Sequence, residues 1–187
     1  MRPRSNAARA AASDTGNSST GTISNTRPIG PVRACRCESL GIAHENGEHR
    51  LVAVQPIAEG KTIFRLEGEI TAKPTRYSVQ IGKTLHLDSG SAHAMDDVFD
   101  RYYWRFMNHA CDPSAVIRGG EVIARRDIAP WEDVTFNYNT TEYDMAEPFV
   151  CRCGSVQCEG TIRGAKHLSP KRRAKLRPMM APHLLDG

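Results

Sequence analysis

Four cysteines in the second half of the chain have the spacing of a metal site. Cys151, Cys153 and Cys158 follow one another as C-x-C-x4-C, and Cys111 precedes them by 40 residues. Structural zinc takes four ligands in a tetrahedron, commonly four thiolates, so the three close cysteines need one more. Cys111 is the natural fourth ligand if the fold brings it near, and the imidazole of His109 is the chemical alternative. The sequence therefore predicts structural zinc.

The two remaining cysteines, Cys35 and Cys37, have no further ligands nearby in the sequence, and we expect them to be free thiols. The N-terminus lacks the apolar stretch of a secretory signal peptide, which favours a reducing compartment, the cytoplasm. The Arg- and Ser-rich residues 1–33 also resemble an organelle transit peptide, so an organelle, or the nucleus, is the alternative location.

Elements that would position the cysteines are short and mainly β. Strands are predicted where apolar and polar residues alternate or cluster between turn residues. These stretches are 51–54, 61–71, 77–81, 85–88, 115–118, 121–125 and 133–138. Gly119-Gly120 predicts a tight hairpin, because glycine supplies the positive φ of such turns. Helical spacing appears within 96–107, and Ser169-Pro170 predicts the start of a short helix.

The charge is divided along the 187 residues. Residues 1–33 carry five Arg and one Asp, are rich in Ser, Thr and Asn, and are predicted to be disordered. Residues 163–187 carry seven basic residues and one acidic residue, whereas 34–162 hold 13 basic and 19 acidic residues. An acidic core suits a cationic substrate, although a solvated acidic surface is the alternative. The sequence has no apolar run long enough to predict a membrane span.

Three motifs resemble one family. Residues 105–113 read RFMNHACDP, similar to the R-F-x-N-H-x-C-x-P signature of SET-domain lysine methyltransferases. Residues 132–138 read EDVTFNY, similar to their E-E-L-T-F-D-Y signature, and 66–70 resemble the strand around Y-x-G-E. The cysteine trio resembles the post-SET motif that Cys111 completes in that family. The resemblance covers about 37–163 and is closest to small stand-alone proteins of bacterial type.

The resemblance implies a mainly β protein with the SET-domain β-clip fold and a pseudoknot, in which the N-H-x-C and T-F-x-Y segments meet. It divides the chain into a disordered tail (1–33), a SET domain (37–138), a post-SET zinc motif (147–163) and a basic C-terminal tail with a short helix (164–187). We expect a monomer that does not associate with membranes.

The resemblance also implies S-adenosylmethionine as the cofactor and protein lysine as the methyl acceptor. Tyr138 corresponds to the catalytic tyrosine, which also borders the cofactor. Asn108 and His109 correspond to the pair that contacts the cofactor, and Arg105 belongs to the same binding segment.

The same resemblance suggests which side chains line the lysine channel. Phe136 stands at the family's Phe/Tyr position, where Phe leaves room for an already methylated amine and indicates di- or trimethylation. Tyr77 and Tyr143 are the other candidates for the channel. The expected substrate is a basic protein, histone-like or ribosomal.

One family motif is missing, because the stretch His49-Arg50-Leu51-Val52-Ala53 stands where the family has the glycine-rich G-x-G that approaches the cofactor. This difference supports a first alternative, a catalytically weak SET module that binds proteins. A second alternative is a zinc-containing nucleic-acid binder, since 171–175 is basic. That run is short and lacks the aromatic side chains on which bases stack, so we expect at most weak nucleic-acid binding.

Overall fold

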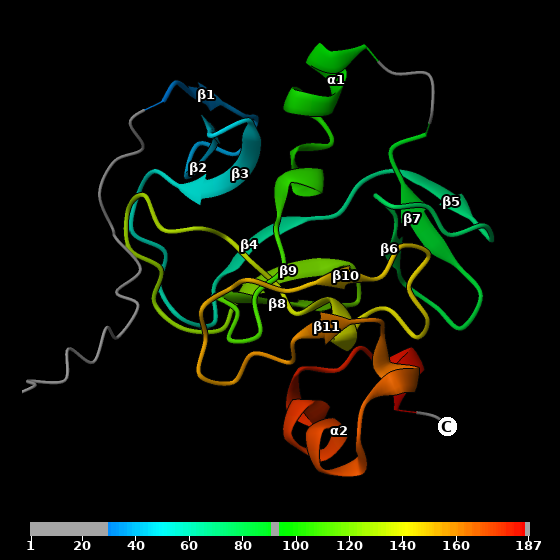
Figure 1. Cartoon of the computed structure of the whole chain (residues 1–187). Coiled ribbons are helices and arrows are strands. Elements are labelled where there is room, and N and C mark those ends of the chain that lie inside the picture. Colours follow the sequence, from blue (N-terminus) through cyan, green and yellow to red (C-terminus); the bar gives the residue numbers. More distant parts are fainter. Residues whose placement is uncertain (1–29, 91–93, 186–187) are drawn as a thin grey trace, which may run out of the picture.

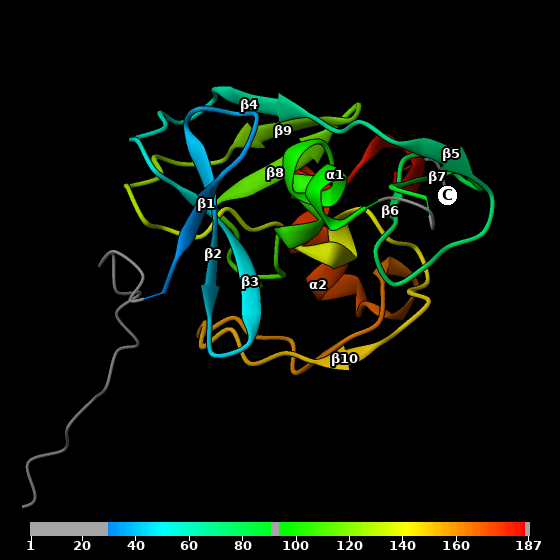
Figure 2. The same ribbon diagram turned by 90° about the horizontal axis from the view of Figure 1, so that it is seen from above.

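A computed structural model describes residues 30–90 and 94–185 of the chain, so most of the predicted N-terminal tail lies outside the described residues. The described part is built from small antiparallel sheets with short helices (Figure 1). Seen from above, the sheet formed within residues 32–53 and the sheet formed within residues 69–88 lie on opposite sides of the helix at residues 95–100 (Figure 2). None of the described helices is long and apolar enough to cross a membrane.

The first sheet has the order β1 (Val32–Ala34), β2 (Leu40–Glu45) and β3 (Glu48–Ala53). Asn46 and Gly47 connect β2 to β3 with φ values of 53° and 82°, and Asn-Gly is a typical pair for such two-residue turns. The predicted disordered tail extends to residue 33, but Val32 and Arg33 already pair with β2. The end of that prediction is therefore wrong.

The second sheet has the order β4 (Thr62–Arg65), β9 (Glu121–Ala124) and β8 (Ala115–Arg118). Gly119 and Gly120 join β8 to β9 with positive φ values of 55° and 81°, which confirms the predicted hairpin. The third sheet has the order β5 (Glu69–Thr71), β7 (His86–Asp88) and β6 (Val79–Gln80).

The predicted strand at 61–71 is two strands in two sheets. Gly68 lies between them, and a side chain there would come within 2.3 Å of the Asp88 carbonyl oxygen. Glycine therefore lets the chain leave the second sheet and pass closely against the third. The predicted helical stretch is likewise divided, into α1 (Met95–Asp100) and the 3₁₀ helix η1 (Tyr103–Phe106).

The stretch 133–138 was predicted as a strand and is not one. It forms isolated bridges, Val52 to Asp133 and His109 to Phe136, and its last residue begins the 3₁₀ helix η2 (Tyr138–Thr140). Successive residues of the stretch pair with different segments, Asp133 with Val52 and Phe136 with His109, so no continuous strand ladder forms. Apolar and polar residues do alternate in this stretch, but the stretch passes through the core between other segments instead of joining a sheet.

The C-terminal part begins with the two-stranded sheet β10 (Phe149–Val150) and β11 (Thr161–Ile162). Four short helices follow: η3 (Ala165–His167), α2 (Pro170–Leu176), η4 (Arg177–Met179) and η5 (Pro182–Leu184). Helix α2 begins as predicted, because the Ser169 side chain accepts a hydrogen bond from the Arg172 amide and Pro170 occupies the first turn.

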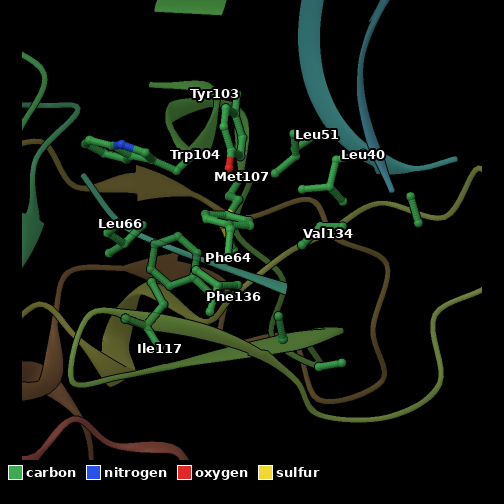
Figure 3. Packing of buried hydrophobic residues seen from close by; sticks show 14 of the residues in the cluster. Leu40, Leu51, Phe64, Leu66, Tyr103, Trp104, Met107, Ile117, Val134 and Phe136 are labelled. Atoms are coloured by element: carbon green, nitrogen blue, oxygen red, sulfur yellow. The ribbon is translucent and has the colours of Figure 1, made fainter. Parts of the chain in front are cut away.

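The main core lies where the first two sheets meet η1 and the 133–138 stretch (Figure 3). Tyr103, Trp104 and Met107 pack on Phe64 and Phe136 in this cluster. The buried indole of Trp104 donates a hydrogen bond to the Glu67 carbonyl oxygen (2.9 Å), so its polar atom is satisfied. This packing holds the segment after η1 against the threaded stretch.

Candidate active site and metal centre

Two segments that are distant in the sequence lie side by side at the centre of the molecule. The Ala110 amide donates to the Phe136 carbonyl oxygen (3.2 Å), and the Phe136 amide donates to the Asn108 carbonyl oxygen (3.3 Å). His109 and Phe136 form a parallel bridge. The segment after η1 and the threaded stretch therefore meet, as the sequence analysis expected for residues 108 and 138.

Tyr138 ends the threaded stretch and points back at the other segment. Its hydroxyl donates a hydrogen bond to the carbonyl oxygen of the buried Met107 (2.9 Å), and its ring lies 4.6 Å from that of Phe136. Burial raises the pKa of the Tyr138 phenol well above its usual range. The hydroxyl therefore stays protonated and has lone pairs left to accept a hydrogen bond.

His109 connects Tyr138 to the cysteines. Its Nδ1 accepts a hydrogen bond from the Tyr138 amide (3.2 Å), so in the neutral ring the proton is on Nε2. Nε2 lies 3.3 Å from the Cys111 sulfur, at the distance of a weak N–H to sulfur hydrogen bond. Burial lowers the pKa of His109 to about 4, so the ring is neutral near pH 7.

The four cysteines predicted from their spacing come together in space. The Sγ atoms of Cys111, Cys151, Cys153 and Cys158 all lie within 4.8 Å of one another. Gly154 makes the turn between them with a φ of 70°. In the described residues the group contains no histidine, and His109 already uses Nδ1 for Tyr138. Four convergent sulfur atoms fit the donor set of structural zinc, with no need for His109 as a ligand.

Burial disfavours the ionised form of two thiols in the cluster. It raises the pKa of the Cys111 thiol, and it raises that of Cys151 to about 11. Thiolates are the form that binds metal, and a divalent ion would offset the cost of ionising these buried groups. Cys35 and Cys37 lie apart as partly buried free thiols, and the described residues show no second group of metal-binding side chains around them.

His49 stands where the glycine-rich motif is missing. Its ring packs against Phe99 (5.4 Å), Phe106 (5.2 Å) and His44 (4.5 Å between centroids). Its carbonyl oxygen accepts a hydrogen bond from the Asn108 side chain (3.4 Å). The imidazole is thus held by its aromatic neighbours, while the backbone of residue 49 faces the expected cofactor segment.

Arg105 and Tyr77 form a second pair near the same segment. The Arg105 guanidinium lies 4.1 Å from the centroid of the Tyr77 ring, which is 48% exposed. The family resemblance predicts that Arg105 belongs to the cofactor-binding segment and that Tyr77 lines the channel. The structure brings the two together, and among the described residues Tyr77 makes no ring contact with Tyr138.

Phe136 and Tyr143, the other channel candidates, have different surroundings. Phe136 is buried beside Tyr138, whereas the Tyr143 side chain is 49% exposed. The Tyr143 amide donates to the Gln80 side chain (2.7 Å), and the Gln80 amide donates to the Glu142 carboxylate (2.8 Å). These two hydrogen bonds connect Gln80, at the end of β6, to residues 142 and 143, which follow Tyr138.

Glu142 and Gln80 were not found by sequence reasoning. Both are buried, and burial raises the pKa of the Glu142 carboxyl to about 7. Glu142 stands four residues after Tyr138, but no sequence pattern connects it with residue 80. Its importance depends on a contact between β6 and the residues after η2, which spacing does not reveal.

Comparison with known proteins places this geometry in a family. Residues 48–139 match the family model for the SET domain. The chain is 31% identical over 125 residues to the histone-lysine N-methyltransferase ash1 of Drosophila melanogaster, covering 58% of this chain and 6% of that protein. It is 33% identical over 118 residues to methyltransferase flvH of Aspergillus flavus, covering 61% and 59%. The chain thus spans less than two thirds of either relative.

A solved structure supports the fold. The chain resembles KRYPTONITE in complex with mCHH DNA, an H3(1-15) peptide and SAH, with a TM-score of 0.50 and 17% identity. The similarity covers 65% of this chain and 29% of that one. The two crossed segments carry the motifs, and both segments lie within the matched residues 48–139. Residues 48–139 match the SET domain, and the fold of the chain is that of SET-domain proteins.

Proposed function

We propose that this protein transfers a methyl group from S-adenosylmethionine to the side chain of lysine in a basic protein. The observation that carries the proposal is the placement of Tyr138, whose hydroxyl meets the Met107 carbonyl where the two segments cross. Two relatives support it, since ash1 is named a histone-lysine N-methyltransferase and flvH a methyltransferase. The KRYPTONITE structure contains SAH and, in one complex, an H3 peptide.

The residues around position 49 fit such a cofactor. S-adenosylmethionine supplies a methyl group on a positively charged sulfonium. The Arg105 guanidinium offers a positive charge for a carboxylate. The Asn108 amide and the His49 carbonyl offer polar atoms for an ammonium group, and they already lie within 3.4 Å of each other. The His49 ring packs against Phe99 and Phe106. The side chain at position 49 therefore does not occupy the space that a glycine would leave open for the cofactor.

Tyr138 would orient the attacking amine. A free lysine has a pKa of about 10.4 and must lose a proton to solvent before its nitrogen can attack. The nitrogen then bonds to the methyl carbon while the bond from that carbon to sulfur breaks, and the sulfur leaves with the electron pair as neutral S-adenosylhomocysteine. The Tyr138 hydroxyl donates to Met107 and remains neutral, so its oxygen accepts a hydrogen bond from the amine. The Met107 carbonyl is a second acceptor in the same place. These acceptors fix the direction of the nitrogen lone pair, which is mostly a positioning task.

The surroundings also favour certain substrates and products. Residues 34–162 have an excess of acidic over basic side chains, which would attract a lysine-rich protein, histone-like or ribosomal. Phe136 lies beside Tyr138 and offers no hydroxyl to hold a water molecule there. We therefore propose that the enzyme adds more than one methyl group to the same lysine.

The experiment is incubation of the full chain with isotopically labelled S-adenosylmethionine and a panel of basic proteins, followed by mass spectrometry. The proposal expects label on lysine, and none on a matched peptide in which every lysine is arginine. Label on another residue type, or no label on any member of a proteome-wide panel, would contradict it.

A catalytically weak, protein-binding SET module is the second candidate, and His49 in place of glycine favours it. Calorimetry with S-adenosylmethionine separates the two. Binding with a Kd in or below the range of about 1 μM to 1 mM, where substrates of enzymes usually bind, supports the enzyme. Absence of binding supports the module.

A further inference from the structure

The end of the chain packs beneath the residues that follow Tyr138. Residues 164–185 lie beyond the SET match and beyond the cysteine motif, and Figure 1 shows them below β11. They have a small hydrophobic cluster of their own, formed by Ala165, Leu176, Met180 and Leu184. The segment is therefore a packed unit rather than a loose tail. We call it the C-terminal segment, and residues 138–143 the tyrosine turn.

Five consecutive residues of the tyrosine turn accept hydrogen bonds from this segment. The donor and acceptor pairs are Gly164 to the Asn139 side chain (2.8 Å), Ala181 to the Thr140 carbonyl (2.8 Å), His183 Nε2 to the Thr141 carbonyl (2.8 Å), Ala165 to the Glu142 carbonyl (2.8 Å) and Lys166 to the Tyr143 carbonyl (2.9 Å). No regular helix or sheet continues from the turn, so these donors take the place of secondary structure.

Gly164 shows how close the approach is. Its φ is 105°, a conformation that other residues rarely adopt, and a Cβ there would lie 2.6 Å from the Tyr143 carbonyl oxygen. Backbone therefore meets backbone at this point, and only glycine allows it. The segment and the turn are fitted to each other rather than loosely apposed.

His183 provides the one side-chain donor among the five bonds. Thr141 is fully buried and Thr140 is 1% exposed, so water does not reach the turn easily. A carbonyl oxygen can only accept, so the bond fixes the His183 proton on Nε2. Without this imidazole the Thr141 carbonyl would lose its donor, and a buried acceptor left unsatisfied costs more than the bond itself contributes.

We propose that the C-terminal segment holds the tyrosine turn in place and that His183 is a positioning residue for Tyr138, acting through the Thr141 carbonyl. The inference rests on the proposed methyl transfer. The route is short, because the Thr141 and Glu142 amides both donate to the Tyr138 carbonyl oxygen, at 3.2 and 2.9 Å. Movement of Thr141 therefore moves the backbone that aims the phenol.

The test compares His183→Ala and His183→Gln with the parent chain. The glutamine side chain can place an amide donor near the former Nε2, so it should rescue what alanine loses. The matched control is His167→Ala, another histidine of the C-terminal segment, whose side chain pairs with the exposed Asp144 and does not bond the turn.

Hydrogen exchange followed by mass spectrometry gives the first readout and needs no activity. In His183→Ala, protection of amides in 138–143 should fall by about ten- to a hundredfold, as expected for one buried carbonyl left without a donor. His183→Gln and His167→Ala should keep protection near that of the parent. Unchanged exchange in His183→Ala would overturn the proposal, whether or not the protein methylates lysine.

Kinetics and metal content give the second readout. In an active enzyme, His183→Ala should lower kcat by about ten- to a hundredfold, as for a small misplacement of a catalytic group, with KM for S-adenosylmethionine within about twofold. Bound metal should stay equal to that of the parent. Faster exchange with unchanged kcat would show a purely structural role and contradict positioning. Loss of metal would contradict the proposed route through Thr141.

Discussion

At the scale of single residues, the site combines groups that sequence patterns reveal with groups that they do not. Cys111 and the C-x-C-x4-C cysteines were predicted from spacing and resemblance, and their sulfur atoms converge. Tyr138 was predicted from its motif, and its hydroxyl meets the neighbouring segment. Glu142 and His183 belong to no motif. Their roles come from contacts with residues 62 and 42 positions away, at Gln80 and Thr141.

Glu142 predicts a dependence of stability on pH. Its folded pKa of about 7 lies above the ordinary value of 4.5, because burial disfavours the charged form. Between these values the folded state binds more protons than the unfolded state, so the free energy of unfolding should fall as pH rises through this window, by at most about 1.4 kcal/mol per pH unit. Denaturant titrations at several pH values measure it.

The variant Glu142→Gln keeps an oxygen acceptor for the Gln80 amide and removes the titrating proton. The decline between pH 4.5 and 7 should therefore be shallower in Glu142→Gln than in the parent. Glu59→Gln, at an exposed position, serves as control and should leave the slope unchanged. Equal slopes in the parent and Glu142→Gln would contradict the assignment.

The cysteine cluster predicts a metal-dependent fold of the C-terminal half. Cys153→Ser removes one of four thiolates, so bound zinc per chain should fall from about one toward zero, and the melting temperature should drop because zinc binding contributes to folding. Elemental analysis and thermal melting measure both. Cys35→Ser, which alters a free thiol outside the cluster, should keep the metal. Full zinc content in Cys153→Ser would reject this ligand set.

At the scale of elements, local turn chemistry was predictable and threading was not. The Gly119-Gly120 hairpin follows from the positive φ that only glycine adopts easily. The strand β2 was missed, although Asn46-Gly47 was a usable signal for its hairpin with β3. Residues 133–138 look like a strand because apolar Val134 and Phe136 alternate with polar residues, although 134–137 are all buried. Their partners change from β3 to residue 109, and spacing does not show this.

The C-terminal segment gives a prediction at this scale. Gly164→Ala should destabilise the protein by about 2–4 kcal/mol, because the new methyl group meets the Tyr143 carbonyl and strains the backbone. Gly120→Ala is the matched control. It also has a positive φ, but its Cβ would meet nothing within 4 Å, so the cost should be only about 1–2 kcal/mol.

Chemical denaturation of the two glycine variants separates backbone strain from the close contact. A loss in Gly164→Ala no larger than in Gly120→Ala would mean that the segment yields easily. The tyrosine turn would then not depend on this approach.

At the scale of the whole molecule, the match to the SET domain covers about half of the chain. The matched residues 48–139 contain the crossed segments, but the cysteine trio and the C-terminal segment lie after them. Sequence reasoning described residues 164–187 as a basic tail with a short helix. The helix α2 is present, and 164–185 also pack on the tyrosine turn. Basic surface residues concealed this packing, because its apolar positions are few and unevenly spaced.

The charge is also divided between the middle of the chain and its two ends. The acidic residues belong to the part that holds the crossed segments, and the basic residues gather toward the ends of the sequence. An acidic body would attract lysine-rich proteins, and this attraction should weaken as salt screens the charges. In our proposal, the charge distribution favours a class of substrate, and the crossed segments carry out the chemistry.

The most direct measurement compares methyl transfer by the parent chain and by Tyr138→Phe, with the same basic protein substrate and saturating S-adenosylmethionine. The variant removes a single oxygen, the one that meets Met107 and would orient the amine. Our account predicts that kcat falls by about a hundredfold or more, while circular dichroism and zinc content stay unchanged. Methyl transfer at the parental rate by Tyr138→Phe would contradict it.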